Sequence, residues 1–180
     1  MKRTLITMMG VAAVFLVAAG TLSAQLVRAR VWPPGFKAQV ALDTMESPRE
    51  ISAPYGKVFL AAVAAFDELK IPLDQRDSIH GVVGNLAIRK VGSFAGSQLS
   101  RWFNCGIGIT GANADNFRIS LAVALILDPV QGSDKTLLRA GAVAGAEDRQ
   151  GSMKEAVACG STGGLEAKLV ELVRKKAGVP

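Results

Sequence analysis

The sequence contains few of the residues that most often carry catalysis or bind metal ions. It has one histidine and two cysteines among 180 residues, and the acidic residues Asp74, Asp77 and Asp115 are scattered along the chain. Zinc sites draw most of their ligands from cysteine and histidine, so the chain lacks a ligand set of that kind. No acid pair and no Ser-His-Asp set can be proposed either. The sequence therefore predicts no catalytic residue, no metal site and no cofactor.

Aromatic residues and concentrated positive charge are also scarce. Aromatic residues make up 6% of the chain, and the net charge of +6 is spread over its length. Proteins that bind single-stranded nucleic acids combine a basic groove with aromatic side chains on which the bases stack. The composition instead favours an ordinary solvated basic surface and no nucleic-acid partner.

A long stretch without charge follows the basic start of the chain. No charged residue lies between Arg3 and Arg28, and most residues in this interval are apolar. A basic start, an apolar core and a small-residue exit are the parts of a secretory signal peptide. We assign residues 1–24 to this signal.

The fate of the signal segment stays open at this point. Cleavage after Ala24 or after Gly20 predicts a mature protein that begins between Thr21 and Arg30. Alternatively, residues 4–27 remain as an uncleaved anchor, because about 20 apolar residues suffice to cross a bilayer. The first interpretation predicts a periplasmic or extracellular protein. The second predicts an inner-membrane anchor with the domain outside the cytoplasm.

The rest of the chain fits one α+β domain, residues 36–180, preceded by a tether over residues 25–35. The adjacent prolines Pro33 and Pro34 exclude a helix in the tether and favour extended backbone. Apolar and polar residues then alternate from Phe36 to Asp43. This alternation predicts a half-buried strand.

Two segments have the periodicity of amphipathic helices. The first begins at Pro54, with Ser52 as a candidate cap, and ends before Pro72. The second runs from Thr162 to about Ala177, with Thr162 as its cap. In this helix Glu166 suits the positive end of the dipole and three basic residues suit the negative end.

Strands occupy most of the chain between these helices. Segments 71–75 and 81–91 predict a hairpin, with Gly84 as a candidate bulge. One helical turn is expected over 98–104, and segments 117–127 and 136–146 predict a second hairpin. The order β-α-β-β-β-β-α predicts an α+β fold, an antiparallel sheet of about five strands with both helices on one face.

Small residues dominate the face of this sheet that the helices are expected to leave free. Surfaces of this kind often accept a partner, although strands also simply tolerate alanine. The expected residues of the flat face are Ala122, Ala124, Ala140, Ala142 and Ala144.

Cys105 and Cys159 are the only cysteines. In an exported chain such a pair is most simply a disulfide, with the two Cα atoms within about 7 Å of each other. The bond would fix a long irregular segment beside the start of the last helix. The alternative is a thiol enzyme, in which Cys159 is the nucleophile before a helix N-terminus and His80 is the base.

Two glycine-rich segments resemble binding motifs. Residues 106–111 match G-x-G-x-x-G and Asp128 follows, but a dinucleotide site requires a strand before the motif and a helix after it. We attribute the match to chance and the glycines to a flexible loop. Residues 160–164 could hold an anion at a helix start, although ordinary capping explains them more simply.

Two motifs give the chain a resemblance to a known group. Residues 99–106, L-S-R-W-F-N-C-G, and residues 159–166, C-G-S-T-G-G-L-E, are similar to those of uncharacterised bacterial exported proteins that share two cysteines and a closing helix. The resemblance covers about residues 36–178, and it implies neither an activity nor a catalytic residue. The arrangement also resembles the domains of accessory outer-membrane lipoproteins, at the level of fold alone.

These observations predict a non-enzymatic exported protein of the cell envelope that binds another protein, a lipid or the cell wall. The alternative is an enzyme that uses Cys159 or the glycine-rich loops. Titration of free thiols separates the two classes, because a disulfide protein has no free thiol.

Overall fold

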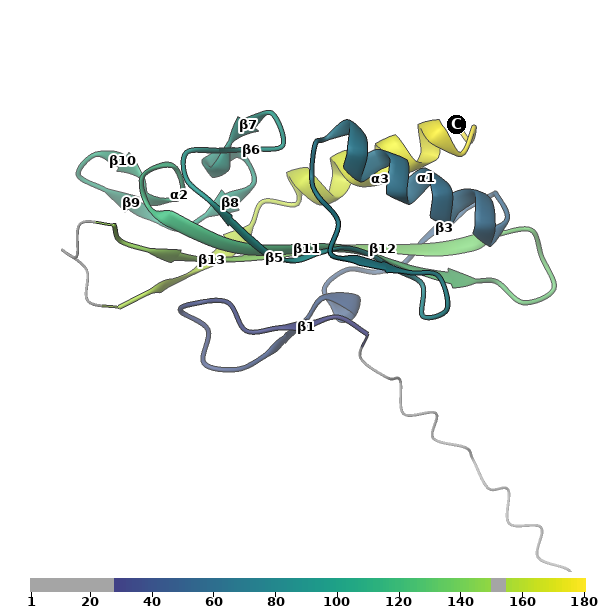
Figure 1. The fold of residues 1–180 in the computed structure, drawn as a ribbon, viewed down its shortest axis with the longest axis horizontal. Coiled ribbons are helices and arrows are strands. Elements are labelled where there is room, and N and C mark those ends of the chain that lie inside the picture. The colour runs from purple at the N-terminus through teal and green to yellow at the C-terminus, as the bar shows by residue number, and fades with distance from the viewer. Residues whose placement is uncertain (1–27, 150–154) are drawn as a thin grey trace, which may run out of the picture.

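The computed structural model describes residues 28–149 and 155–180, which form an antiparallel sheet with two helices on one face (Figure 1). The predicted signal segment, both cleavage sites and the first residues of the predicted tether lie outside the described residues. No helix within these two ranges is long and apolar enough to cross a membrane.

The main sheet has seven strands in the described part of the chain. Its centre is a long hairpin of two strands that pair over their whole lengths. In order of pairing the strands are β4 (Gln75–Asp77), β5 (Val82–Lys90), β11 (Arg118–Pro129), β12 (Thr136–Glu147), β13 (Val157–Ser161) and β8 (Phe103–Asn104), and β3 (Arg49–Ile51) pairs with the other end of β12. The predicted fold class is confirmed, although the sheet has more strands than expected.

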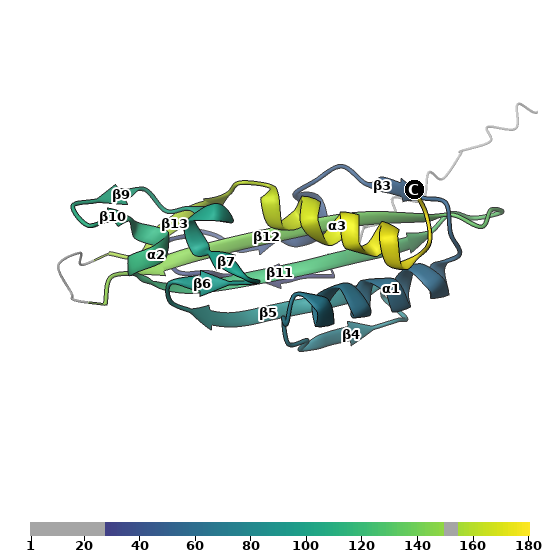
Figure 2. The same cartoon turned by 90° about the horizontal axis from the view of Figure 1, so that it is seen from above.

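The helices α1 (Tyr55–Glu68) and α3 (Gly164–Lys176) pack against each other and over the same face of the sheet (Figure 2). Both predicted helices are confirmed, and α3 buries its apolar residues Leu165, Leu169, Leu172 and Val173. The predicted cap Ser52 is wrong, because the N-cap position of α1 is Pro54. The N-cap position of α3 is Gly163, one residue after the predicted cap Thr162, whose hydroxyl accepts the Gly164 N–H. Gly163 has a φ of 77°, a left-handed conformation that glycine adopts at little cost.

The alternating segment from Phe36 to Asp43 is not a strand of the main sheet, so this prediction is wrong. Only β2 (Val40–Ala41) is extended there, and it pairs with β1 (Arg30–Val31) outside the main sheet. The 3-10 turn η1 (Leu42–Thr44) follows. The segment is half-buried because it lies across a face of the sheet. Alternation of apolar and polar residues therefore indicates that one side of a segment is buried, but it does not identify the surface against which that side packs. Strand β3, which the sequence did not reveal, precedes α1 instead.

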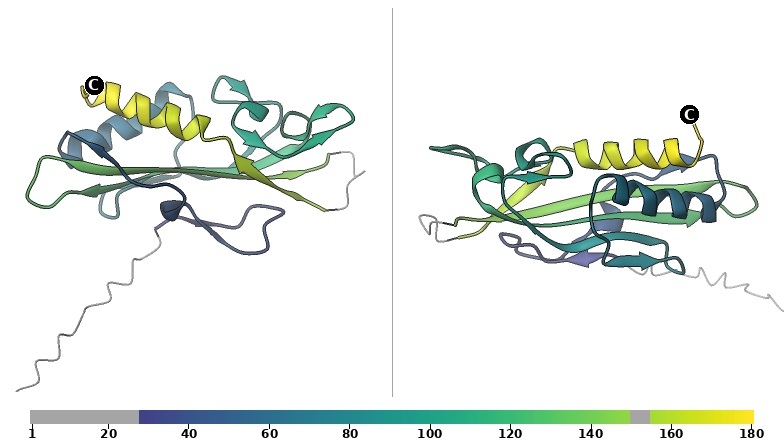
Figure 3. Two further views of the ribbon diagram at one scale, coloured as in Figure 1. Left: turned by 180° about the vertical axis from the view of Figure 1, so that it is seen from behind. Right: turned by 45° about the horizontal axis from the view of Figure 1, so that its top comes forward.

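Residues 28–45 form a layer on the face of the sheet opposite the helices (Figures 1 and 3). We call this layer the N-terminal strap. Ala29 and Leu42 are completely buried in it, in a cluster with Ala122, Ala124, Ile126 and Val143 of the sheet. Residues 28–35, which the sequence assigned to a tether, are therefore packed against the sheet.

The alanine-lined face predicted from the sequence does not exist as a single surface. The register pairs Leu121 with Ala144, Val123 with Ala142 and Leu125 with Ala140, which places these three alanines on the helix side. Only Ala122 and Ala124 lie on the opposite side, beneath the strap. The prediction failed because a register shift of one residue moves every side chain of a strand to the other face.

A charged cluster and two glycines hold the strap close to the sheet. Arg28 donates two hydrogen bonds to Asp128, from Nη1 to Oδ1 at 2.8 Å and from Nη2 to Oδ2 at 3.0 Å. Arg139 Nη1 donates to the same carboxylate at 2.8 Å. Gly141 and Gly145 of β12 lie directly against the strap backbone, where a Cβ atom would overlap it.

The hairpin of β4 and β5 is confirmed, with β4 a few residues later than the expected strand 71–75. The irregularity in β5 lies between Asn85 and Ile88, so the predicted bulge at Gly84 is wrong. Gly84 instead allows close approach to β11, because a Cβ atom there would overlap the Val123 carbonyl oxygen.

The connection between β5 and β11 folds into small elements at one end of the sheet. The predicted helical turn is present in shortened form as η2 (Leu99–Arg101). The other elements of this end are β6 (Ser93–Phe94), β7 (Ser97–Gln98), β9 (Ile107–Gly108), β10 (Gly111–Ala112) and the short helix α2 (Asn113–Asn116).

Candidate functional site

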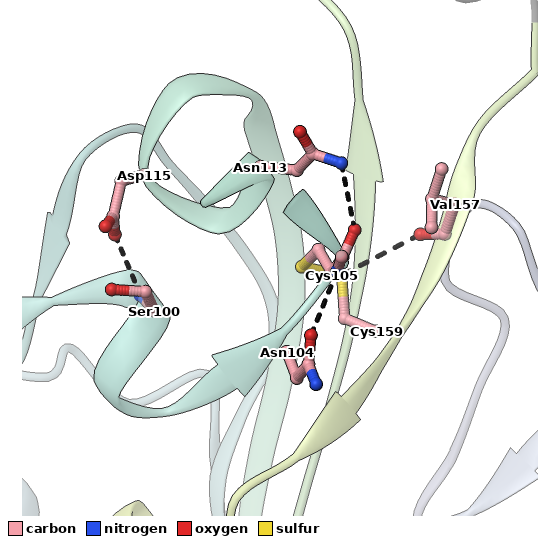
Figure 4. Close-up of a disulfide and its surroundings, with 8 residues drawn as sticks. Ser100, Asn104, Cys105, Asn113, Asp115, Val157 and Cys159 are labelled. Carbon is pink, nitrogen blue, oxygen red and sulfur yellow. Dashed lines mark hydrogen bonds between the residues drawn. A yellow bond between two sulfur atoms is a disulfide. The ribbon is translucent and has the colours of Figure 1, made fainter. Parts of the chain in front are cut away.

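Cys105 follows β8 and Cys159 lies in β13, and the two form the predicted disulfide (Figure 4). Their Cα atoms are 4.3 Å apart, and the residues are only 2% and 3% exposed. Asn113 supports the site by donating a hydrogen bond from Nδ2 to the Cys105 carbonyl at 3.1 Å. Disulfides persist mainly in oxidising compartments outside the cytoplasm, so the bond suggests such a location.

The disulfide removes the basis of the thiol-enzyme alternative, because both cysteines of the chain are in the bond. His80, the base in that alternative, lies in the exposed turn between β4 and β5. Its Nδ1 is 2.6 Å from Asp77 Oδ2. Hydrogen bonds from the His80 backbone and ring hold the pKa of Asp77 below its usual value. His80 therefore stabilises the conformation of the β4–β5 turn through its contacts with Asp77.

The two glycine-rich segments have structural roles. Residues 106–111 lie largely within the β9–β10 hairpin, which is not the strand, loop and long helix of a dinucleotide site. At the start of α3, the Gly163 N–H donates to Ser161 Oγ at 3.0 Å and the Gly164 N–H donates to Thr162 Oγ1 at 3.3 Å. The chain's own hydroxyls therefore accept the amide hydrogens that an anion would need.

The scattered acidic residues bind neighbouring parts of the chain. The Asp74 carboxylate accepts the Leu86 N–H, and Asp115 accepts the Ser100 N–H at 2.8 Å (Figure 4). Asp128 binds the strap. Among residues 28–149 and 155–180, no group of three or more histidine, cysteine or acidic side chains is placed to hold a metal ion.

A groove of about 300 Å³ lies between the strap and the sheet. We call it the strap groove. This volume is at the lower end of the range of small-ligand pockets. The groove is lined by residues 31–34 of the strap, residues 86–89 of β5, residues 120–122 of β11 and Glu147 of β12.

Trp32 forms the aromatic wall of the strap groove. Its side chain is 65% exposed, whereas Trp102, the other tryptophan, is 7% exposed. The Trp32 indole N–H donates to the Phe36 carbonyl at 2.7 Å, which fixes the ring within the strap. An indole whose only donor is already used presents a flat apolar ring to a ligand.

Three polar side chains line the strap groove on the strap side of the sheet. Ser120 is the cross-strand partner of Arg89, and Glu147 is the partner of Arg118. Cross-strand partners project to the same face, as do residues two apart in one strand. Arg89 can only donate hydrogen bonds, ionised Glu147 can only accept them, and the Ser120 hydroxyl does both.

The polar groups of the groove are available to a ligand. The side chains of Arg89 and Glu147 form no hydrogen bond or salt bridge with any residue of the described ranges. Both residues are exposed, and Ser120 is half-buried. The strap groove thus combines a fixed apolar ring with free donors and acceptors.

Sequence reasoning missed this site because it placed Trp32 in a tether. The Trp-Pro-Pro sequence was a visible signal, since the chain has only two tryptophans. Arg89, Ser120 and Glu147 are far from Trp32 and from one another in sequence, and only the strand register and the strap bring them together.

No protein-family model and no curated protein matches the chain.

Proposed function

We propose that the chain is an exported, non-enzymatic binding domain of the bacterial cell envelope, and that the strap groove binds the saccharide part of the cell wall. One observation carries this proposal. A fixed, exposed indole ring and the free polar groups of Arg89, Ser120 and Glu147 line the same groove.

The chemistry of a sugar ring suits this combination. A sugar ring has an apolar face of C–H groups, which can stack on the Trp32 indole, and hydroxyls around its edge. Each hydroxyl is both a donor and an acceptor, so it can pair with Arg89, Glu147 or Ser120. A small number of placed polar groups in an otherwise apolar groove is the usual composition of a ligand site.

Other classes of envelope ligand fit the groove less well. An acyl chain would desolvate Arg89 and Glu147 without giving either a hydrogen-bond partner. A densely anionic ligand would meet the negative charge of Glu147. A peptide could pair with both charges, and it is therefore the competing ligand in the test below.

The compartment in the proposal rests on two independent features. The first 24 residues have the composition of a secretory signal, and a disulfide is typical of proteins outside the cytoplasm. The periplasm, or the outer surface of the cell, is the location that we propose.

Co-sedimentation with purified insoluble cell walls tests the proposed function. We expect the processed protein to sediment with the walls, and Trp32→Ala to weaken binding by about tenfold or more, as for a central aromatic contact. Arg89→Ala provides a second groove variant. Leu60→Ala is the matched control, because Leu60 is 62% exposed on α1, on the other side of the sheet.

Soluble fragments identify the part of the wall that binds. Saccharide fragments without peptide should compete for the protein, and stem peptides without sugar should not. The proposal is overturned if the wild-type protein stays in solution, if Leu60→Ala loses as much binding as Trp32→Ala, or if only the peptides compete.

A further inference from the structure

The β9–β10 hairpin lies at one end of the sheet (Figure 1). It contains two exposed isoleucines, Ile107 and Ile109. Ile107 is 85% exposed and Ile109 is 106% exposed, so both side chains extend fully into solvent. Residues 106–111 are all exposed, and we call this segment the hairpin tip. Adjacent exposed apolar side chains of this size suggest a surface that contacts something.

The base of the hairpin tip is firmly attached to the core. Cys105 immediately precedes the tip and is bonded to Cys159 in β13. The Asn113 backbone N–H donates to the Gly106 carbonyl at 3.0 Å, and the Asn113 side chain binds the Cys105 carbonyl. The disulfide and the hydrogen bonds of Asn113 therefore fix the base of the hairpin from which the two isoleucines project.

The backbone of the hairpin tip is largely satisfied from within. Gly108 pairs with Gly111 and Ile107 pairs with Ala112 in the two short strands. Asn116 Nδ2 donates to the Thr110 carbonyl at 3.3 Å and to the Ala112 carbonyl at 3.1 Å. A nonpolar medium provides no hydrogen-bond partners for backbone N–H and C=O groups. A segment that enters such a medium must therefore form these hydrogen bonds within the protein.

The charges around the hairpin tip suit a lipid surface. No charged residue lies between Arg101 and Asp115, and the Asp115 carboxylate accepts the Ser100 N–H. Exposed basic residues stand at the same end of the sheet, namely Arg101 in η2 and Lys90 at the end of β5. Basic residues beside an apolar tip attract anionic headgroups.

The small size of the tip favours a bilayer over a protein partner. Stable protein interfaces bury about 800 Å² on each partner, and two isoleucines on a narrow hairpin provide much less. A bilayer sets no such minimum area, because each apolar side chain that enters it contributes separately.

We propose that the hairpin tip inserts Ile107 and Ile109 into an anionic lipid bilayer, with Arg101 and Lys90 at the level of the headgroups. This site goes beyond the strap groove. It uses different residues, so either proposal can fail without the other.

Vesicle flotation tests the bilayer proposal with the processed protein, so that segment 4–27 does not itself bind lipid. We expect binding to phosphatidylcholine vesicles that contain phosphatidylglycerol, and weaker binding at high salt or without the anionic lipid. Ile107→Ser/Ile109→Ser should lower the bound fraction by about tenfold or more. Circular dichroism and the absence of free thiols verify that this variant is folded.

Ile79→Ser is the matched control. Ile79 is 89% exposed in the β4–β5 turn, at the opposite end of the sheet (Figure 2). It should bind vesicles as well as the wild-type protein does. The proposal is overturned if the wild-type protein binds neither vesicle, if the double variant binds normally, or if Ile79→Ser loses as much binding as the double variant. Capture of an envelope protein by the tip without vesicle binding also overturns it.

Discussion

Glu166 lies in the first turn of α3 and is only 3% exposed, although glutamate is rarely buried. Ser161 Oγ donates to its Oε1 at 2.6 Å, and Oε2 has no hydrogen-bond partner in the described structure. Burial raises the pKa of the Glu166 carboxyl, although the hydrogen bond from Ser161 opposes this in part. The folded protein therefore holds this proton more tightly than the unfolded chain does. Stability should fall as the pH rises from the unfolded pKa through the folded pKa.

Glu166→Gln tests this interpretation. Glutamine keeps the shape of the side chain and cannot ionise, so we expect the variant to be more stable than the wild-type protein at pH 8, by about 1 kcal/mol. The difference should shrink as the pH is lowered and the wild-type carboxyl becomes protonated. Urea denaturation at several pH values measures both effects, with exposed Glu171→Gln as the control. A variant that is less stable than the wild-type protein at pH 8 would contradict the prediction.

The pKa of the Asp128 carboxyl is shifted in the opposite direction from that of Glu166. Burial raises its pKa, but the hydrogen bonds and charges of Arg28 and Arg139 outweigh burial and lower it below the usual value. We expect Asp128→Asn to reduce the free energy of unfolding by about 1–2 kcal/mol, a modest loss because the side chain is 34% exposed and solvent screens the pair. The loss should be complete at neutral pH and disappear in acid, as the wild-type carboxylate itself becomes protonated. Denaturant melts measure it, and Asp67→Asn on the exposed side of α1 should change little.

At the scale of elements, long periodic segments were predictable and short ones were not. The helix α3 and the hairpin of β11 and β12 could be read from their patterns, because each repeats its burial over many residues. Strand β3 has three residues, too few for a pattern. Apolar and polar residues alternate in the strap, but this alternation does not identify the surface that the strap covers. The strap groove was missed for the same reason.

The disulfide gives the clearest prediction for an element. It connects the segment after β8 to β13, across a sequence separation of 54 residues. Removal of the disulfide should increase the conformational entropy of the unfolded chain. It should lower the free energy of unfolding by roughly 2–5 kcal/mol, with the secondary structure retained. Cys105→Ser and Cys159→Ser should give equal losses, and the double variant should be no worse than either. Thermal or denaturant melts of the three variants decide this, and additive losses would contradict it.

At the scale of the whole molecule, the strap makes the sheet a middle layer between the helices and the N-terminal segment. Because Arg28 and Ala29 are packed on the sheet, processing should leave both in the mature protein. N-terminal sequencing should therefore find a start from Thr21 to Arg28, within the window predicted from the signal segment. A mature protein that begins after Arg28 would contradict this role of the strap.

Deletion of the strap should expose the apolar side chains beneath it. We expect residues 25–180 to fold like the mature protein. Residues 46–180 should lose about 3 kcal/mol or more, because Ala122, Ala124, Ile126 and Val143 lose their cover. Denaturant melts compare the two chains, and equal stabilities would show that the strap contributes nothing to the fold.

Protection of Trp32 provides the sharpest check of the strap groove as a saccharide site. Trp32 is exposed and Trp102 is buried, so acrylamide quenching of tryptophan fluorescence reports mainly on the groove. Soluble cell-wall saccharides should protect the wild-type protein from quenching, with saturation at high ligand concentration. The double variant Arg89→Ala/Glu147→Ala should show little protection at the same concentrations. Quenching that the saccharides leave unchanged in the wild-type protein, or that they reduce equally in the double variant, would contradict a saccharide site in the groove.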